Sequence, residues 1–396
     1  MTNGIPRLLT YRGIPLWRDV RVLQATGQLV SVVLVVSVVV FFAANLVSAA
    51  DERGLSLGFD FLGQEAGFPI GESVIGYDEA DSFLYAFGVG IANTLKAALL
   101  GVLFATVIGV LVGLARLSSN WVVRNLAGIY IQTVRNIPLL VQLFFWYFAV
   151  FQALPLVQEA IRLPGPVYLS NRGLFLVWPR ATSSFDTWLV FLAIGLALAA
   201  GLRFALSRGE QRSGRPLHTV VVPWLAFLGV GAAGWLAADG SPLVRSVPTL
   251  GAFNFEGGVR ITPEFGSLLV GLVLYTATFI AEIVRAGVQS VSRGQTEAAL
   301  ALGLSDVQTT RLVVFPQALR VIVPPLISQY LNLTKNSSLA VAIAYPELFT
   351  VGRTMINQAG RAVPIFLLIM AAYLAMSLTW AAIGNFYNRR VQMVER

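Results

Sequence analysis

The side chains most often used for catalysis and metal binding are scarce in this sequence of 396 residues. It has no cysteine, one histidine (His218) and two lysines, Lys96 and Lys335. The lack of cysteine excludes disulfides, thiolate metal sites and a thiol nucleophile, and one histidine cannot form a multi-histidine metal cluster. A phosphate-binding loop needs Gly-Lys-Ser/Thr, and neither lysine has that setting. We therefore expect no metal, cofactor or ATPase site on this chain.

The carboxylates are concentrated in one segment. Eight acidic residues and a single base, Arg53, lie between Asp51 and Asp81. A membrane-embedded enzyme would need His, Cys or carboxylates clustered near one face. Here a solvated outer loop is the simpler interpretation of the acidic segment.

The composition indicates a membrane protein. Apolar residues make up 56% of the chain and charged residues 12%, and the mean hydropathy is +0.72. Soluble domains carry roughly a quarter charged residues, about twice the fraction found here. An apolar helix crosses the ~30 Å hydrocarbon core in about 20 residues, and several such stretches are present.

Eight apolar stretches are expected to cross the membrane, which predicts an all-α fold. They lie at about 28–50, 94–114, 139–153, 188–206, 219–237, 266–283, 339–345 and 364–383. The seventh is the least regular, because Pro324, Pro325 and several polar residues interrupt it. The first has features of a signal peptide, but its apolar part is longer than such segments usually have.

The arginines predict the orientation. They gather before the first stretch and after the second, fourth, sixth and eighth, with Arg116, Arg208, Arg285 and Arg389 as examples. The connections at 51–81, 155–185 and 238–265 lack such clusters. Basic loops stay in the cytoplasm, so both termini are expected there. The same bias accounts for the net charge of +8 without nucleic-acid binding.

The segment from Ser292 to Pro316 differs from an ordinary inside loop. Two pairs fit capping boxes, in which a serine and a glutamine three residues later hold a first helical turn: Ser292 with Gln295, and Ser305 with Gln308. Gly303 stands where a helix commonly ends in the left-handed conformation. We expect Pro316 to end the second helix, which gives a helix–turn–helix elbow in the cytoplasm.

The elbow resembles a known signature. Glu297-Ala298-Ala299, three residues, Gly303, nine residues and Val313-Val314-Phe315-Pro316 are similar to the EAA motif of ABC importer permeases. Members of that family usually have Leu where this chain has Phe315. In the family this elbow fits a cleft on a cytoplasmic ATPase. The resemblance implies that Glu297, Ala298, Ala299 and Gly303 make that contact.

Further segments are similar to the polar amino-acid branch of the family: Asn93-Thr94-Leu95, Arg135 to Gln142, Ala281 to Arg285 and Lys335 to Leu339. The branch ordinarily has Gly-Thr at Asn136-Ile137 and often Asp-Thr at Asn336-Ser337, which weakens the transfer of substrate contacts. The length and the inserted pair of stretches look like the general L-amino-acid permease subgroup.

The expected architecture is a type I ABC importer permease core with an extra N-terminal helix and an inserted helix pair. Residues 1–90 would hold the cytoplasmic N-terminus, the extra helix and an acidic periplasmic loop. Residues 91–388 would form the permease domain, with its core at 91–154 and 264–388 and the insertion at 155–263. Residues 389–396 would be a cytoplasmic tail.

A few polar residues in or near these stretches are candidates for the translocation pathway: Lys335, Gln142, Asn336 and Ser337. Charge in a membrane is costly and usually faces a cavity or a partner. Lys96 lies near a helix start, where snorkelling to the interface is the alternative to a pathway role. Glu282 and Arg285 are three residues apart, so a structural ion pair is expected.

The resemblance implies a permease subunit that imports amino acids, with a broad range of L-amino acids, across the bacterial inner membrane. It implies a cytoplasmic ABC ATPase dimer that hydrolyses ATP, a second homologous permease subunit or a second copy of this chain, and a periplasmic amino-acid-binding protein. The alternative is an ion-coupled secondary transporter, which would show an inverted repeat with paired broken helices. No convincing repeat of that kind is found in the sequence.

Overall fold

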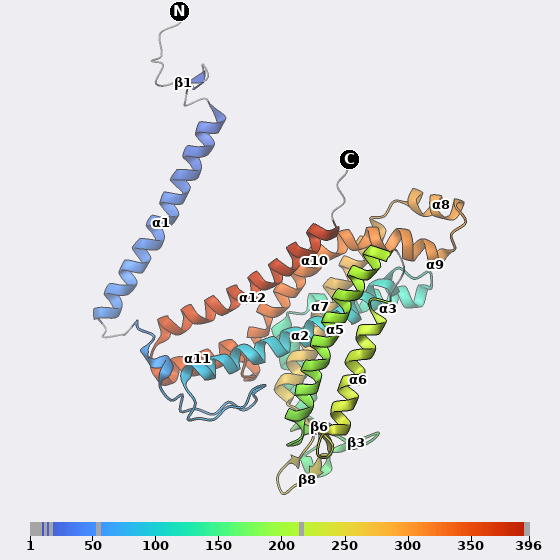
Figure 1. The fold of residues 1–396 in the computed structure, drawn as a ribbon. Coiled ribbons are helices and arrows are strands. Elements are labelled where there is room, and N and C mark those ends of the chain that lie inside the picture. The colour runs from blue at the N-terminus through green and yellow to red at the C-terminus, as the bar shows by residue number, and fades with distance from the viewer. Residues whose placement is uncertain (1–9, 12–13, 16–18, 53–56, 214–217, 392–396) are drawn as a thin grey trace, which may run out of the picture.

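The structure is a computed structural model that describes residues 10–11, 14–15, 19–52, 57–213 and 218–391 (Figure 1). Of the predicted cytoplasmic ends, residues 1–9 and 392–396 lie outside this part of the chain. The described chain is mostly helical. Its helices are α1 (Val20–Glu52), α2 (Phe83–Arg116), α3 (Trp121–Asn136), α4 (Leu139–Phe144), α5 (Phe185–Ser213), α6 (Val221–Ala237), α7 (Pro263–Gln289), α8 (Arg293–Ala301), α9 (Asp306–Thr309), α10 (Phe315–Asn336), α11 (Leu348–Ala359) and α12 (Ala362–Val391).

The core is built around α2 and α7, which pack along one another over most of their length. Small residues make this close approach possible. A Cβ atom on Gly109 would lie 2.6 Å from Ile280, and one on Gly113 would lie 2.7 Å from the carbonyl oxygen of Ala281. Helices in membranes associate through such small-residue contacts, because lipid provides no hydrophobic drive between them.

Two clusters of buried apolar side chains stabilise the bundle. The first joins α2, α4, α7, α10 and the 3-10 turn Ser337–Ile343, with Leu143, Leu272 and Leu333 at its centre. The second joins the start of α2 to α11, α12 and the segment 61–77 that precedes α2. The acidic segment therefore folds onto the bundle and is not only a solvated loop.

One helix breaks sharply. α3 and the continuation of α4 through the π-helical turn Phe145–Phe151 are bent by 101° at Ile137 and Pro138. A residue before proline is driven out of the helical conformation, and Ile137 accordingly has φ −91° and ψ 126°. The buried Gln142 amide donates to the carbonyl oxygens of Val134 (2.8 Å) and Ile137 (2.9 Å), which the break leaves without helical partners.

Six described helical segments are long and apolar enough to cross a membrane, or seven if the bent pair counts as one span. α6 is also apolar but has 17 residues. The eight predicted stretches all fall on these elements, while their number and orientation remain predictions. The start of α1, the end of α12 and the α8–α9 elbow lie toward one end of the molecule, and most of the small strands lie toward the other (Figure 1).

The predicted outer loops contain short strands that the all-α expectation did not include. A four-stranded antiparallel sheet has the order β10-β5-β4-β3, and two strand pairs, β6-β7 and β8-β9, lie apart from it; a further pair, β1-β2, lies in the predicted cytoplasmic N-terminus. The strands are β1 (Thr10–Tyr11), β2 (Ile14–Pro15), β3 (Ile161–Leu163), β4 (Val167–Ser170), β5 (Gly173–Leu176), β6 (Trp178–Ala181), β7 (Leu243–Ser246), β8 (Thr249–Leu250), β9 (Phe255–Glu256) and β10 (Val259–Ile261). Strands of two to four residues are too short for alternation to be visible in the sequence.

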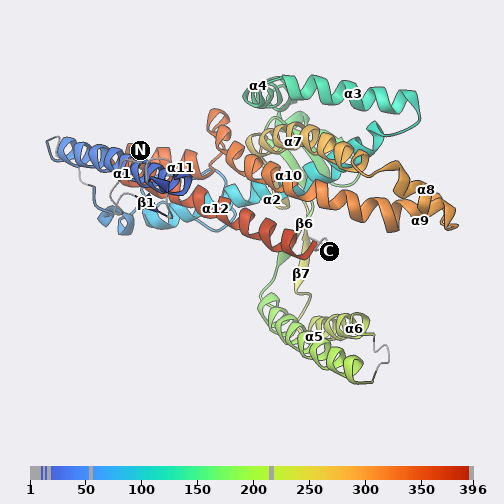
Figure 2. The same ribbon diagram turned by 90° about the horizontal axis from the view of Figure 1, so that it is seen from above.

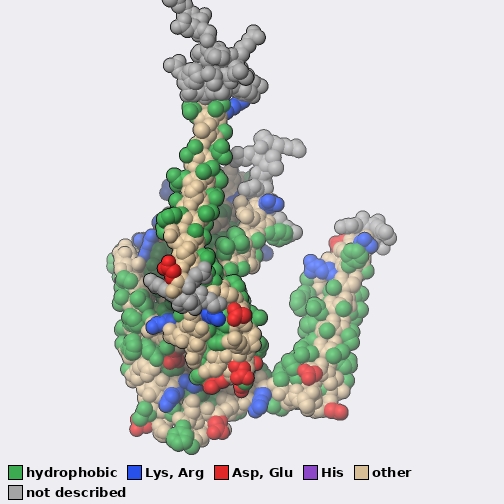
Figure 3. All heavy atoms as spheres, turned by 90° about the vertical axis from the view of Figure 1, so that its left-hand side faces the viewer, with side chains coloured by type: hydrophobic (Ala, Val, Ile, Leu, Met, Phe, Trp, Pro, Cys, Tyr) green, Lys and Arg blue, Asp and Glu red, His purple; other side chains and the backbone are tan. Residues whose placement is uncertain are grey.

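The insertion forms a separate helical hairpin of α5 and α6. These helices pack on each other and make no extensive contact with another helix of the described chain. Their link to the core runs through β6 and β7, and both views show the inserted hairpin standing away from the bundle (Figures 2 and 3). α1 is likewise uncovered by the rest of the chain, since its apolar side chains from Leu29 to Phe42 are about half exposed or more.

The contact between α2 and α7 can be tested with two glycines of α2. Gly113→Ala should lower the melting temperature and cost about 1–3 kcal/mol, because the new methyl group meets backbone atoms of α7. Gly88→Ala is the matched control, since a Cβ there has nothing within 4 Å and alanine favours the helix. Thermal melts of the detergent-solubilised chain measure both. Equal melting temperatures for the two variants would contradict the packing described here.

Candidate functional site

The elbow comprises residues 293–314: α8, a turn, α9 and the π-helical turn Thr310–Val314. Gly303 ends α8 in the left-handed conformation, with φ +81°. Its N–H donates to Leu300 O (2.9 Å), and the Leu304 N–H donates to Ala299 O (3.2 Å). These two bonds form a Schellman motif, which fixes the direction in which the chain leaves the helix.

One of the two expected capping boxes is present. Ser305 Oγ accepts from the Gln308 N–H (3.3 Å), and Gln308 Oε1 accepts from the Ser305 N–H (2.9 Å). The expectation for Ser292 was wrong, because Ser292 precedes α8 without a side-chain cap bond. Gln295 Oε1 instead accepts from Gln317 Nε2 (3.3 Å), which ties α8 to α10.

The prediction that Pro316 ends the second elbow helix was also wrong. Pro316 lies in the first turn of α10, where its missing N–H is tolerated. The π-helical turn Thr310–Val314 joins α9 to α10 directly. The elbow is therefore continuous with a long apolar helix that also contains Pro324 and Pro325.

The tip of the elbow exposes large apolar side chains. Leu302 is 83% exposed and Val307 is 76% exposed. Glu297 and Ala298 are also exposed, whereas Ala299 is buried inside the elbow. Exposed apolar groups gathered on a projecting element are typical of an interaction surface.

The candidate pathway residues lie on three elements: Gln142 on α4, Lys335 and Asn336 at the end of α10, and Ser337 at the start of the 3-10 turn, which touches α4. The Gln142 amide donates to backbone carbonyls at the helix break, and the buried Ser337 hydroxyl donates to Thr334 O (2.7 Å). Asn336 is half-buried, and the Lys335 side chain is exposed and forms no hydrogen bond or ion pair within the described chain. Of the four candidates, Lys335 and Asn336 therefore have side chains that are not already used in bonds within the described chain.

Glu282 and Arg285 lie on one face of α7. Arg285 donates to Glu282 Oε2 through Nη2 (2.8 Å) and Nε (3.1 Å), and to Gln289 Oε1 through Nη1 (2.7 Å). Arg135 places its guanidinium 4.9 Å from the centre of the Phe279 ring, also on α7. The structural role of the Glu282–Arg285 pair remains a prediction.

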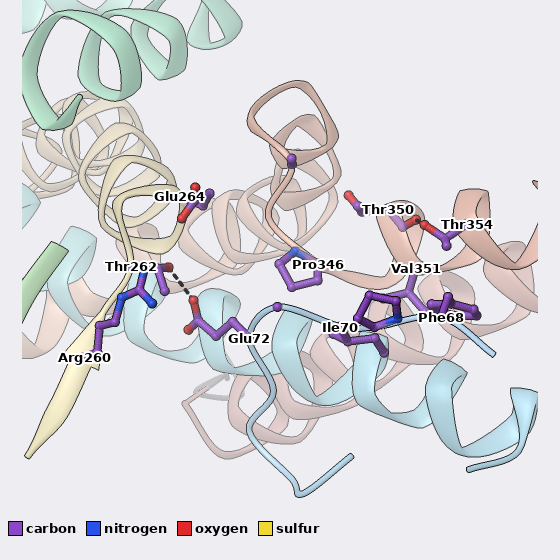
Figure 4. A pocket seen from close by; sticks show the side chains of 13 residues that line it. Phe68, Ile70, Glu72, Arg260, Thr262, Glu264, Pro346, Thr350, Val351 and Thr354 are labelled. Atoms are coloured by element: carbon purple, nitrogen blue, oxygen red, sulfur yellow. Dashed lines mark hydrogen bonds between the residues drawn. The ribbon is translucent and has the colours of Figure 1, made fainter. Parts of the chain in front are cut away.

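At the other end of α7 lies a cavity of ≈ 430 Å³, called the outer cavity below (Figure 4). Its walls come from the segment 68–72, β10, the first turn of α7, and α11 with the turn before it. Glu72 reaches into this region and binds two partners, the Lys96 ammonium at 2.5 Å and the Thr262 hydroxyl. The Lys96 ammonium also lies 4.0 Å from the centre of the Phe265 ring.

The buried Asn93 holds this region together. Its amide donates to the carbonyl oxygens of Glu72 and Pro346, both at 2.8 Å, and its Oδ1 accepts from the Val74 N–H (3.1 Å). One turn of α2 thus anchors both the segment before it and the turn before α11. Sequence reasoning missed the Glu72–Lys96 pair, because Glu72 was counted with the solvated carboxylates. A lysine near a helix start, preceded by an acidic segment, is the signal that could have indicated it.

The comparisons with known proteins all lead to components of transport systems. Residues 217–393 match the family model described as binding-protein-dependent transport system inner membrane component. A putative amino-acid ABC transporter permease protein of Escherichia coli is 43% identical over 375 residues, which cover 93% of this chain and 94% of that protein. A general L-amino acid transport system permease protein of Rhizobium johnstonii is 42% identical over 373 residues, covering 93% of this chain and 92% of that protein. A solved amino acid ABC transporter with histidines aligns over 78% of this chain and 95% of its own, with 21% identity and a TM-score of 0.47.

The Glu72–Lys96 pair should stabilise the outer end of the bundle. Lys96→Met should lower the melting temperature and cost about 1–3 kcal/mol, because it leaves the Glu72 carboxylate, 13% exposed, without its cation. The double variant with Glu72→Gln should recover most of the loss. Glu65→Gln, at an exposed position of the same segment, is the control and should change little. A melt of Lys96→Met that matches the wild type would show that the pair contributes nothing.

The left-handed turn of the elbow should be sensitive to a side chain. Gly303→Ala should cost about 1–2 kcal/mol locally, because an L-residue is strained at φ +81° even though the space is open. Hydrogen exchange of the elbow amides should then be about 5- to 30-fold faster. Gly294→Ala, on α8 with equally open space and no positive φ, should leave the exchange unchanged. Equal exchange in the two variants would argue against the Schellman turn.

Proposed function

Because this chain belongs to the amino-acid ABC transporter permeases, we propose that it imports L-amino acids of several side-chain classes, driven by an ATPase that docks on its elbow. The family membership makes the chain a multi-pass transport protein of the inner membrane and not an enzyme. Hydrolysis of ATP takes place on a partner subunit. Our proposal covers three further points: the range of substrates, the docking surface and the domain limits.

The single observation that carries the docking proposal is the exposed apolar tip of the elbow. Leu302 and Val307 project from a turn whose backbone is fixed by Gly303 and by the Ser305 cap. Glu297 and Ala298 flank this tip, and the buried Ala299 supports it from inside. A rigid projection with an apolar end suits a cleft on a cytoplasmic protein.

Because α9 is continuous with α10, a movement of the elbow can be transmitted to the translocation pathway. A rotation of the elbow on closure of the ATPase pair would move α10 through the turn Thr310–Val314. α10 ends at Lys335 and Asn336, so the same movement reaches these two pathway candidates. Gln142 and Ser337 would position the elements beside them through their backbone contacts. The result is alternating access driven from the cytoplasm.

The broad substrate range is proposed from the likeness to a general L-amino acid permease, which extends beyond the permease core at 91–154 and 264–388 into the inserted segment 155–263. The general L-amino acid permease of Rhizobium johnstonii matches over nearly the whole length, insertion included. The remaining parts of the proposed assembly are a pair of ATPase subunits, a second homologous permease or a second copy of this chain, and a periplasmic amino-acid-binding protein.

The docking proposal predicts that a charge at the elbow tip abolishes the assembly. Leu302→Asp and Val307→Asp should each reduce recovery of the ATPase with the tagged chain by about tenfold or more, because a buried, unpaired carboxylate would face an apolar cleft. Co-purification from the native membrane in gentle detergent, followed by identification of the bound ATPase, measures this. Both positions are exposed, so the stability of the chain itself should change by less than about 0.5 kcal/mol.

The matched control is Phe253→Asp, at a position 88% exposed in the outer part of the insertion. It should retain the ATPase and leave amino-acid uptake intact. Full recovery of the ATPase with Leu302→Asp would place the docking surface elsewhere. Uptake that stops on addition of a proton uncoupler but persists after ATP depletion would favour the ion-coupled transporter instead.

A further inference from the structure

The outer cavity is lined by one cationic and one anionic side chain whose hydrogen-bonding atoms are not all used. Glu72 is already engaged, since one carboxylate oxygen binds Lys96 and the other accepts from Thr262. Arg260 uses Nε to donate to Arg172 O (2.8 Å), and its two terminal nitrogens have no hydrogen-bond partner within the described chain. Glu264 accepts from the Tyr147 hydroxyl (3.1 Å) through Oε1, and its other oxygen has no hydrogen-bond partner in the described chain. One cation and one anion therefore line the cavity with hydrogen-bonding capacity to spare.

The cavity is also divided along its length. Arg260, Glu264 and the Glu72–Thr262 pair gather at one end, and Thr350, Thr354, Val351 and Ile70 lie at the other, with Pro346 between them (Figure 4). Small-molecule sites commonly have volumes of about 300–1,000 Å³, so ≈ 430 Å³ is sufficient for a small solute. A charged end and an end of methyl and hydroxyl groups match a molecule with a zwitterionic head and a variable tail.

We propose that the outer cavity binds a free α-amino acid as its zwitterion. The α-carboxylate pairs with the terminal nitrogens of Arg260, whose planar fork suits a carboxylate. The α-ammonium pairs with Glu264, and the side chain lies toward Val351, Thr350 and Thr354. This inference rests on the proposed function and deepens it, because it identifies where the substrate is held at the outer face.

The end of the cavity that is lined by methyl and hydroxyl groups affects the range of substrates. Threonine offers a hydroxyl and a methyl group, so Thr350 and Thr354 can meet polar or apolar side chains, while Val351 and Ile70 supply apolar surface. A site that binds the α-carboxylate and α-ammonium groups strongly and the side chain weakly accepts many amino acids. A side chain from a docked protein lacks a free head group, so it would leave either Arg260 or Glu264 without its partner.

The test uses the full-length chain purified in detergent, without nucleotide, and labelled L-leucine and L-glutamine as probes. Leucine methyl ester lacks the carboxylate charge, and N-acetyl-leucine lacks the ammonium charge. Arg260→Gln should weaken leucine binding by about tenfold or more and leave the already weak methyl ester unchanged. Glu264→Gln should weaken leucine similarly and leave N-acetyl-leucine unchanged. Arg245→Gln and Glu159→Gln remove charge of the same signs at exposed positions outside the cavity and should have no effect.

Several outcomes would overturn the inference. Binding of leucine that is equal in the wild type, Arg260→Gln and Glu264→Gln would place the site elsewhere, as would no binding to the wild type at millimolar probe. Variants that bind amino acids normally but lose stimulation of ATP hydrolysis by the binding protein would show that the cavity receives a segment of that protein. Uptake by the complete wild-type transporter is measured in parallel. Absence of uptake for every amino acid tested would reject the proposed function, whereas normal uptake with unaltered variants would reject only this site.

Discussion

Inside a lipid bilayer every backbone N–H and C=O group must find its partner within the protein, and this constraint decides where the chain can depart from a helix. The long apolar helices meet it by themselves. At two breaks among them, polar side chains form hydrogen bonds with the freed backbone groups. Gln142 serves the carbonyls at the break after α3, and Asn93 and Thr94 serve the turn before α11, where Thr94 Oγ1 accepts from the Leu348 N–H (3.0 Å). Glu347 then caps α11 by accepting from the N–H groups of Phe349 and Thr350.

The same constraint separates the two ends of the molecule by chemistry. At the end that carries the elbow, the backbone is in ordinary turns with their own caps, so the surface there is free to expose apolar side chains to a partner. At the other end the turns are held by buried polar side chains, and these bring charged groups together around a cavity. The proposed docking and binding sites therefore lie at opposite ends of α7 and α10, and a movement of these helices would connect them.

Much of this arrangement could be predicted from the sequence, because apolar length and local caps depend on neighbouring residues. The spans, the left-handed turn at Gly303 and the cap at Ser305 are of that kind. What could not be predicted depends on contacts between distant parts of the chain. Gln295 forms no cap with Ser292 because Gln317 occupies its side chain, and Pro316 ends no helix because a π-helical turn precedes it. Glu72 and Arg260 line the same cavity although they lie far apart in the sequence, and no local pattern indicates that they meet there.

The way the inserted hairpin is attached bears on how permeases of different length can share one core. Because β6 pairs with β7, with Ala181 opposite Leu243, the two ends of the hairpin leave and rejoin the chain side by side. A short turn between these residues would close the strand pair and shorten the protein by about 60 residues without moving a core helix. Proteins tolerate the insertion of a segment whose two ends lie close together. The hairpin can therefore acquire its own interactions in the membrane and diverge at its own rate, while α2, α7 and α10 remain bound by close packing.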